Sequence, residues 1–357
     1  MFRFIRHTAG LLSVIRILAR HDALFPDALA GTSPVLGRVA SLISRRDSTR
    51  QPGQRLAAAL QQLGPSFVKL GQTLSTRPDI LGQAIALDLA ELQDRLPPFP
   101  ASQAVATIEQ ELGQPVASLF TAFDPVPVAA ASIAQVHFAT VREPDGAVRE
   151  VAVKVLRPGI ERAFRRDLEL FRWLADMADR WLPDLRRLKP GEVVDLMART
   201  VRLEMNLRME AAAAAELAEN FRGDPTFRIP AVDWDRTSIR VLTTDRVRGI
   251  PVDEVDRLRA AGHNPDTILQ HAALVFFRQV FRDGFFHADL HPGNLFVNDQ
   301  GTLTAVDFGI MGRLDRATRC FLADMLVGFL KGDYARVSEV HFEAGYVPPD
   351  QDAGLFT

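Results

Sequence analysis

The stretch FFHADLHPGNLFV, residues 285–297, gathers two histidines, an aspartate and an asparagine between apolar ends. Three interpretations compete: a metal cluster, a phosphate-transfer loop, or a polar turn between two core elements. Pro292 and Gly293 break any helix that would present His287 and His291 to a single zinc ion. We therefore expect His287 to brace the loop through a backbone hydrogen bond. A simple polar turn would leave two motifs elsewhere in the chain unexplained.

The first of these motifs is VDFG, residues 306–309, which comes shortly after the loop in the sequence. Two short apolar runs flank Asn-Asp-Gln-Gly at residues 298–301, which predicts a hairpin. This hairpin would return Asp307, in VDFG, to the neighbourhood of Asp289 and Asn294. The second motif is VAVK, which ends at Lys154 in a β-rich run.

These residue types in this order are typical of phosphoryl transfer. Carboxylate and amide oxygens hold Mg²⁺, and a lysine tethers the phosphates that are not transferred. We expect Lys154 to bind the α/β-phosphates and Asn294 and Asp307 to hold the metal. Asp289 would orient the attacking water or hydroxyl. The expected cofactors are ATP and Mg²⁺.

The totals narrow the class of protein. A chain of 357 residues allows two modest domains, or one large one with an extension. The net charge of −2 gives no overall attraction to nucleic acid. The single cysteine, Cys320, excludes an intrachain disulfide and suits a reducing compartment. No apolar run reaches the length of about 18 residues that a membrane-spanning helix needs.

Residues 1–20, MFRFIRHTAGLLSVIRILAR, carry four arginines and no acidic residue, with apolar residues at roughly helical spacing. A basic amphipathic helix of this kind can lie on an anionic membrane surface. It can also dock on its own domain and show its arginines to water, which is the more frequent arrangement and the one that we favour.

By its composition and its pattern of apolar residues, the whole chain divides into three segments, predicted at residues 1–100, 101–248 and 249–357. The first is helical. The second begins with a helix that ends at Gly113 and continues with strands IAQVHFATV and VREVAVKVL around a Pro-Asp-Gly turn. Long helical stretches follow at 161–182 and 193–221, and then two strands joined by an Asp-Arg turn within residues 227–245. The third segment is mainly helical apart from the loop and hairpin described above.

Together these motifs resemble the UbiB family of atypical, protein-kinase-like proteins, known as ADCK-type in mitochondria. FVKLGQTLSTRPDI resembles the KxGQ signature of that family, with Lys69, Gly71 and Gln72 in place. AAASIAQVH, residues 129–137, resembles its alanine-rich loop, which replaces the glycine-rich loop of ordinary kinases. The resemblance covers nearly the whole chain from about residue 56.

The resemblance implies an α+β, bilobal protein-kinase-like fold with an N-terminal helical extension that carries the KxGQ segment. The loop residues Ala129, Ala130, Ala131 and Ser132 would cover the nucleotide together with Lys154. Alanine is strained at the positive φ angles that glycine adopts freely, so this loop should form a stiffer cover.

The family usually shows Glu-x-Asp with a second Glu six residues after the first, whereas this chain has Glu204, Asn206 and Glu210. On one helix the two glutamates would lie about 120° apart and face different partners. We expect Glu210 to pair with Lys154, and Glu204 to meet Lys69 or a metal. Asn206 supplies no charge to a metal site.

Lys69 and Gln72 of the KxGQ segment are expected in a short loop-like stretch. Together with Glu204, this stretch would act as a lid. By resemblance, this segment folds over the place where a kinase would hold a protein substrate. ATPase-like turnover is therefore expected rather than phosphorylation of another protein.

By resemblance, the activity would support ubiquinone biosynthesis in the bacterial cytoplasm, at the periphery of the inner membrane. The implied partners are the nucleotide, a membrane surface or polyprenyl lipid, and quinone-biosynthesis proteins, but no nucleic acid. The chain ends soon after VDFG, so we expect either a fragment or an unusually short C-lobe.

Two alternatives stay open. Small-molecule phosphotransferases of the aminoglycoside or choline kinase type share the H-x-D-x-H-P-x-N loop, but not KxGQ followed by an alanine-rich loop. A nucleotide-binding pseudo-enzyme that acts as a scaffold is favoured by Asn206 and disfavoured by the presence of the catalytic residues.

Overall fold

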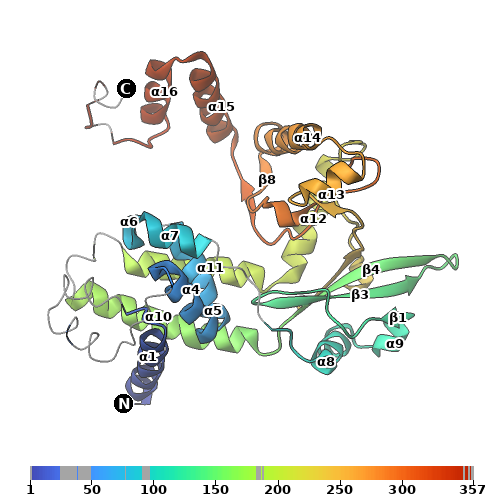
Figure 1. Cartoon of the computed structure of the whole chain (residues 1–357), viewed down its shortest axis with the longest axis horizontal. Helices are drawn as coiled ribbons and strands as arrows, with labels where there is room; N and C mark the ends of the chain where they lie inside the picture. The colour runs from blue at the N-terminus through green and yellow to red at the C-terminus, as the bar shows by residue number, and fades with distance from the viewer. Residues whose placement is uncertain are drawn as a thin grey trace. The chain divides into compact units, whose positions relative to one another are not determined.

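The structure, a computed structural model, describes residues 2–24, 38, 50–76, 78–90, 97–181, 186, 189–348, 350–352 and 354. Its contacts divide the chain into two compact units (Figure 1). Unit 1 comprises Met1–Leu207 and Arg236–Thr243, and unit 2 comprises Arg208–Asp235 and Thr244–Thr357. Residues 208–235 were expected with the middle segment of the chain but pack with the C-terminal part instead. The predicted boundary at 248/249 lies close to the return of the chain into unit 2 at Thr244.

Unit 1 contains a five-stranded sheet. Its order is β1 (Ala122–Phe123), β3 (Ala134–Arg142), β4 (Val148–Leu156) and β6 (Val241–Asp245), and β2 (Ala129–Ala130) also pairs with β3. The β3–β4 hairpin is antiparallel from Ala134↔Leu156 to Arg142↔Val148, as predicted. Helix α8 (Ala101–Leu112) ends at the left-handed Gly113, also as predicted, and contacts β4. Its Ala104 and Ile108 are buried in one core cluster with Val151, Val153 and Val155 of β4.

The other α-helices of unit 1 whose bounds lie within the described residues are α1 (Phe2–Arg20), α4 (Pro52–Leu63), α5 (Pro65–Ser75), α6 (Pro78–Leu81), α7 (Gln83–Ala90), α9 (Val116–Leu119), α10 (Ile160–Trp181) and α11 (Pro190–Glu204). Helix α5 contacts α4, α7, α10 and α11. It carries Lys69 and Gln72, so the expectation of a loop-like KLGQ stretch was wrong. Gly64 and Pro65 begin the helix, and buried Phe67 meets Phe171 of α10 edge-on at 4.9 Å. This packing stabilises helix in spite of Gly71.

Helix α1 packs on its own unit, against α4 and α10. The ring of His7 stacks on Trp173 of α10 with 5.7 Å between the centroids. Arg16 and Arg20 are exposed. This confirms the docked arrangement that we favoured. Among the residues that the structure describes, no helix combines the length and the apolar character needed to cross a bilayer.

The helical stretch predicted at 193–221 is broken. Helix α11 ends at Glu204 and α12 (Leu207–Asn220) begins three residues later. The Asn206 amide donates to Leu203 O in a tight terminal turn, and the Leu207 amide donates to Ile239 O at 2.9 Å. Because Leu207 takes its partner from another segment, the α-helical ladder cannot continue. The 120° projection between Glu204 and Glu210 therefore does not apply.

Unit 2 contains two small sheets. One has the order β5 (Phe227–Arg228), β10 (Leu303–Ala305), β9 (Leu295–Val297) and β7 (Ile250–Pro251), and the other pairs β8 (Phe285–His287) with β11 (Met311–Arg313). The strands predicted within 227–245 join different sheets, because β5 pairs with β10 and β6 with β4. The expected Asp-Arg turn between them is the 3₁₀ helix η2 (Trp234–Arg236).

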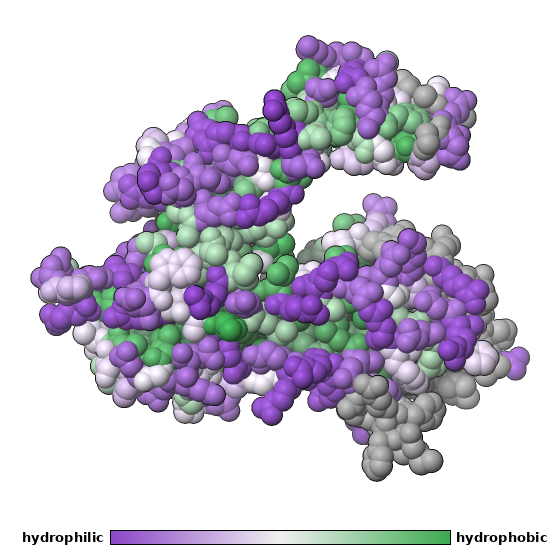
Figure 2. Space-filling model, turned by 180° about the vertical axis from the view of Figure 1, so that it is seen from behind, coloured by the Kyte–Doolittle hydropathy of each residue, from purple (hydrophilic) through white to green (hydrophobic). Residues whose placement is uncertain are grey.

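The helices of unit 2, besides α12, are α13 (Val255–Ala260), α14 (Pro265–Phe277), the π-helix η3 (Arg278–Asp283), the 3₁₀ helix η4 (Pro292–Asn294), α15 (Arg316–Lys331) and α16 (Tyr334–Glu343). Residues of α12, α14 and the strands β5, β8, β9 and β10 form one core, which includes Phe227, Leu303 and Phe308. On the face drawn in Figure 2, hydrophilic residues cover much of the described surface, with hydrophobic patches between them. Phe285, Leu295 and Val297, at the two ends of the stretch 285–297, are themselves part of this core.

Candidate functional site

The predicted hairpin after the loop is confirmed. Strands β9 and β10 are antiparallel, with Ala305 opposite Leu295. One residue further along, the Val306 amide donates to the Asn294 carbonyl at 2.9 Å. Asn294 therefore lies beside the residue that precedes Asp307, as the sequence predicted.

His287 holds the loop with both ring nitrogens. Its Nδ1 accepts a hydrogen bond from the Asp289 amide at 3.2 Å, and its Nε2 lies 3.3 Å from the Val306 carbonyl. Since an amide can only donate and a carbonyl can only accept, these contacts require the Nε2–H tautomer. The bracing role expected for His287 is confirmed, and the residue links the backbone of Asp289 to the segment before Asp307.

The three candidate side chains around this link carry oxygen atoms suited to Mg²⁺. The Asn294 amide nitrogen donates to the Asp289 carbonyl at 3.1 Å, an orientation that turns its Oδ1 away from that bond. The side chains of Asp289 and Asp307 are exposed. Asp307 adopts the left-handed backbone, φ 63°, which is uncommon outside glycine, and buried Phe308 follows it. Mg²⁺ is usually bound by one or two protein oxygens together with substrate phosphates, which this donor set fits.

The loop also restricts His291 and Gly293. The Gly293 amide donates to His291 Nδ1 at 2.8 Å, so this histidine, too, is used in shaping the turn. A Cβ atom on Gly293 would lie 2.7 Å from His291 Cε1. Only glycine fits this position without moving the ring.

In unit 1, the alanine-rich residues form a tight hairpin with β3. Ala129 lies opposite Val136, and Val136 lies opposite the half-buried Lys154 on β4. The Ala131 amide donates to Ala134 O at 2.8 Å and closes the turn. Residues 129–132, all described, avoid the left-handed backbone. The expected alanine strain was therefore wrong, because β-type backbone suits alanine as well as any residue.

Ser132 differs from its neighbours in this loop. It is fully buried, whereas Ala129 is exposed, and its Oγ has no hydrogen-bond partner among the described residues. Its assignment to nucleotide binding stays a prediction.

Two residues that sequence reasoning missed fasten this loop to residues 97–99. The Arg157 guanidinium donates to Pro97 O at 3.0 Å and lies 5.3 Å from the centroid of the Phe99 ring; burial lowers the pKa of this arginine. Buried Gln135 exchanges hydrogen bonds with both backbone groups of Phe99, at 3.0 and 3.2 Å. Polar residues at the alternate positions 135 and 137 of an otherwise apolar strand face were the available signal.

Gln135 also contacts His137. The two side chains meet at 2.8 Å, and His137 Nδ1 donates to the Asp124 carbonyl at 2.9 Å. Desolvation by burial lowers the pKa of His137, and the bond to Asp124 opposes that shift in part.

Lys69 and Glu204 form the predicted ion pair. Lys69 Nζ on α5 lies 2.9 Å from Glu204 Oε1 at the end of α11, and the side chains are 13% and 6% exposed. Gln72, on the same helix as Lys69, is half-buried. Glu210 is buried at the start of α12 in unit 2, whereas Lys154 belongs to unit 1. Their pairing stays a prediction, as do the catalytic roles of all these residues.

The family model described as the ABC1 atypical kinase-like domain matches residues 91–341. The chain is 46% identical over 308 residues to the "Probable protein kinase UbiB" of Marinobacter nauticus, a match that covers 85% of this chain and 56% of that protein. The chain thus spans about half the length of that relative. Among solved structures, the Rv3197–erythromycin complex from Mycobacterium tuberculosis matches with a TM-score of 0.55 and 26% identity, over 90% of this chain and 77% of that one. The chain therefore belongs to the ABC1 atypical kinase-like family of UbiB and ADCK-type proteins and has the α+β kinase-like fold of that family.

Proposed function

We propose that this chain binds ATP with Mg²⁺ and turns it over as an atypical kinase-like ATPase that supports polyprenyl quinone biosynthesis. The observation that carries the proposal is the hydrogen bond from the Val306 amide to the Asn294 carbonyl. It holds a carboxamide and the Asp307 carboxylate at neighbouring points, on the loop that also bears Asp289. The name of the Marinobacter relative, a protein kinase, agrees with this chemistry.

Each residue has a separate task in this proposal. Asn294 and Asp307 would hold Mg²⁺, which neutralises phosphate charge when it is bound. Lys154 would bind the α/β-phosphates. Asp289 would accept a hydrogen bond from the attacking water, whose oxygen bonds to the γ-phosphorus as the bond to ADP breaks. Its exposed carboxylate on a braced backbone suits that task.

ATPase turnover is favoured over protein phosphorylation by the KxGQ helix. Lys69 is tied to Glu204 by a nearly buried ion pair, so α5 is fastened to α11 rather than presented as an open docking site. We infer that this segment serves as a built-in lid.

The first test is Mg²⁺-dependent thermal stabilisation by ATP, measured beside ATP hydrolysis. Asp307→Asn and Lys154→Met should each lose most of the stabilisation and the turnover. Asp299→Asn, in the exposed hairpin turn of the same unit, and Lys331→Met, at the end of α15, are matched controls that should behave like wild type. Full Mg²⁺-dependent stabilisation of Asp307→Asn would show that the metal assignment is wrong.

These two measurements, together with an assay of phosphoryl transfer to small molecules, separate the alternatives. Binding without turnover would favour the pseudo-enzyme, which the uncharged Asn206 supports. Rapid transfer to an aminoglycoside or choline, faster than hydrolysis, would favour the small-molecule phosphotransferase.

The quinone-pathway and membrane parts of the proposal are tested by measuring ATP turnover in the presence of lipid. We propose that the protein works in the cytoplasm at the periphery of the bacterial inner membrane, in contact with polyprenyl lipid and with quinone-biosynthesis proteins. ATP turnover should rise when anionic liposomes and a polyprenyl-phenol analogue are added. If neither addition changes ATP turnover, the membrane and quinone-pathway part of the proposal is wrong.

A further inference from the structure

We propose that Gln279 is a positioning residue for the catalytic loop, which it holds through the backbone of His287. The proposal rests on the proposed function, because it assigns a task to the loop that carries Asp289. Gln279 lies in the π-helix η3 and is fully buried.

The contacts form one continuous chain. Gln279 Oε1 accepts a hydrogen bond from the His287 amide at 2.8 Å. The His287 ring accepts from the Asp289 amide and reaches the Val306 carbonyl. A single glutamine oxygen therefore fixes the residue that orients both the catalytic-loop aspartate and the segment leading to Asp307.

The amide nitrogen of the same side chain indicates that the contact with His287 is the reason why residue 279 is a glutamine. Gln279 Nε2 is buried and has no hydrogen-bond partner among the described residues. Burying an unpaired amide is unfavourable, and a methionine of similar shape would avoid that cost. A residue kept only to fill the core would be apolar. We infer that the acceptor oxygen is needed to hold the His287 backbone.

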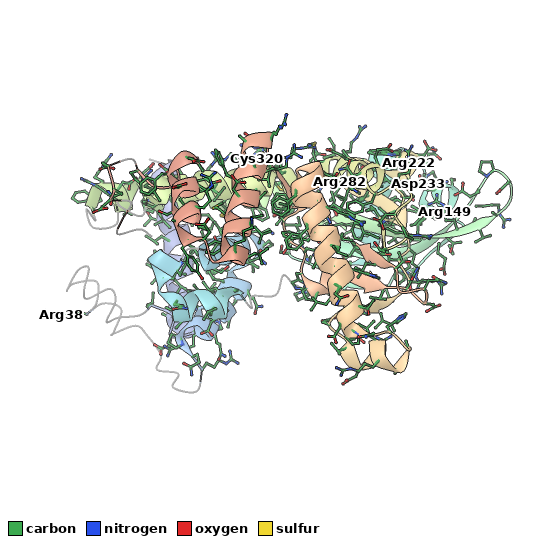
Figure 3. The ribbon with its side chains drawn as sticks, turned by 90° about the horizontal axis from the view of Figure 1, so that it is seen from above. Arg38, Arg149, Arg222, Asp233, Arg282 and Cys320 are labelled. Atoms are coloured by element: carbon green, nitrogen blue, oxygen red, sulfur yellow. The ribbon has the colours of Figure 1, made fainter. Side chains whose placement is uncertain are left out.

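The π-helix explains how this side chain reaches the loop. Its wide turn buries both Gln279 and the next residue, Val280. The chain then turns at Gly284, φ 64°, whose amide donates to Gln279 O, and enters β8 directly. Arg282, labelled in Figure 3, anchors the turn by donating to Asn220 O at 2.8 Å. π-Helical turns occur frequently at functional sites.

The test compares Gln279→Met, which removes the acceptor but keeps the volume, with Gln279→Glu, which keeps an acceptor oxygen. Gln270→Met, at an exposed position on α14, is the matched control. Hydrogen–deuterium exchange of a peptide covering residues 285–297 is measured without nucleotide, so its result is independent of any activity. Melting temperature and ATP turnover are measured on the same samples.

In Gln279→Met we expect the amides of residues 287–289 to exchange roughly five to ten times faster, the change that loss of one hydrogen bond produces in a local opening equilibrium. The melting temperature should hold or rise, and kcat should fall with little change in KM for ATP. Gln279→Glu should restore exchange to within about twofold of wild type. If Gln279→Met does not fold, Gln279→Glu against Gln279→Leu decides the comparison.

Wild-type exchange in a folded Gln279→Met would overturn the proposal, and so would faster exchange in Gln279→Met and Gln279→Glu alike. An inactive wild-type protein whose variants still show the exchange pattern would instead refute the proposed function and leave the positioning role standing.

Discussion

Breaking the Lys69–Glu204 ion pair should destabilise unit 1 far more than breaking an exposed pair of equal length. Both side chains are nearly buried and the charged atoms lie 2.9 Å apart. Lys69→Ala therefore removes a nearly buried cationic partner of the Glu204 carboxylate, which costs roughly 3–5 kcal/mol of unfolding free energy. Glu204→Ala should cost about the same. The double variant should be less destabilised than the sum of the two, by a coupling of roughly 2–3 kcal/mol.

The chain supplies its own control. Lys189 Nζ and Glu192 Oε1 are also 2.9 Å apart, but their side chains are 66% and 70% exposed. Glu192→Ala should therefore cost no more than about 1 kcal/mol.

Urea unfolding followed by tryptophan fluorescence can measure these differences in unit 1 alone. The three tryptophans are Trp173 and Trp181 on α10, and Trp234 in unit 2. In a Trp234→Phe background, the signal reports only on unit 1. ATP affinity and ATPase rate are measured on the same variants, and we expect binding to persist while turnover changes, including a shift toward autophosphorylation.

Unfolding free energies within about 0.5 kcal/mol of wild type for both Lys69→Ala and Glu204→Ala, together with wild-type turnover, would refute the buried pair and the lid. Simple additivity in the double variant would refute the coupling even if each single variant were unstable.

Three further predictions follow from particular contacts. Burial lowers the pKa of His137 from its ordinary value near 6.5. The contribution of neutral His137 to stability is therefore complete above about pH 6.5 and is lost as the pH falls below that value. The melting temperature should accordingly fall less steeply from pH 7 to pH 5 in His137→Phe than in wild type. Gly284→Ala would place a Cβ 2.6 Å from Leu314 O at φ 64°, whereas Gly332→Ala, φ 71°, meets no atom within 4 Å. The second should cost roughly 1–2 kcal/mol in chemical denaturation and the first clearly more, and equal costs would contradict the clash. Deleting residues 2–20 should weaken co-sedimentation with anionic liposomes at low salt, since each basic residue near the surface contributes about 1 kcal/mol; unchanged binding would leave α1 as a docked helix only.

Predictions from the sequence succeeded where one short segment contains all the residues that determine its structure. Asn298 and Gly301 mark a turn in any context, and the apolar runs beside them can only pair as a hairpin, so the proximity of Asn294 and Asp307 followed. The Lys69–Glu204 pair was predictable because a lysine within apolar sequence needs a carboxylate. It also depended on the family pattern, since nothing local connects residues that lie so far apart in the chain.

Predictions failed where a distant segment decides the local structure. Gly71 and the nearby polar residues suggested a loop at KLGQ, but packing on α10 and α11 outweighs the low helix propensity of one glycine. The helix predicted across residues 204–207 ends because Leu207 donates to Ile239, a residue that no pattern around Glu204 reveals. In both places the local preference was weak and the tertiary contact was buried.

The same physics explains which site residues escaped detection. Lys154, Asp289 and Asp307 would act through side chains whose chemistry is visible in the sequence. Gln135, Arg157 and Gln279 act on backbone groups, so their partners can carry any side chain. A motif therefore identifies residues that would touch the nucleotide and metal, whereas the residues that hold those motifs in place become visible only with the coordinates of the backbone.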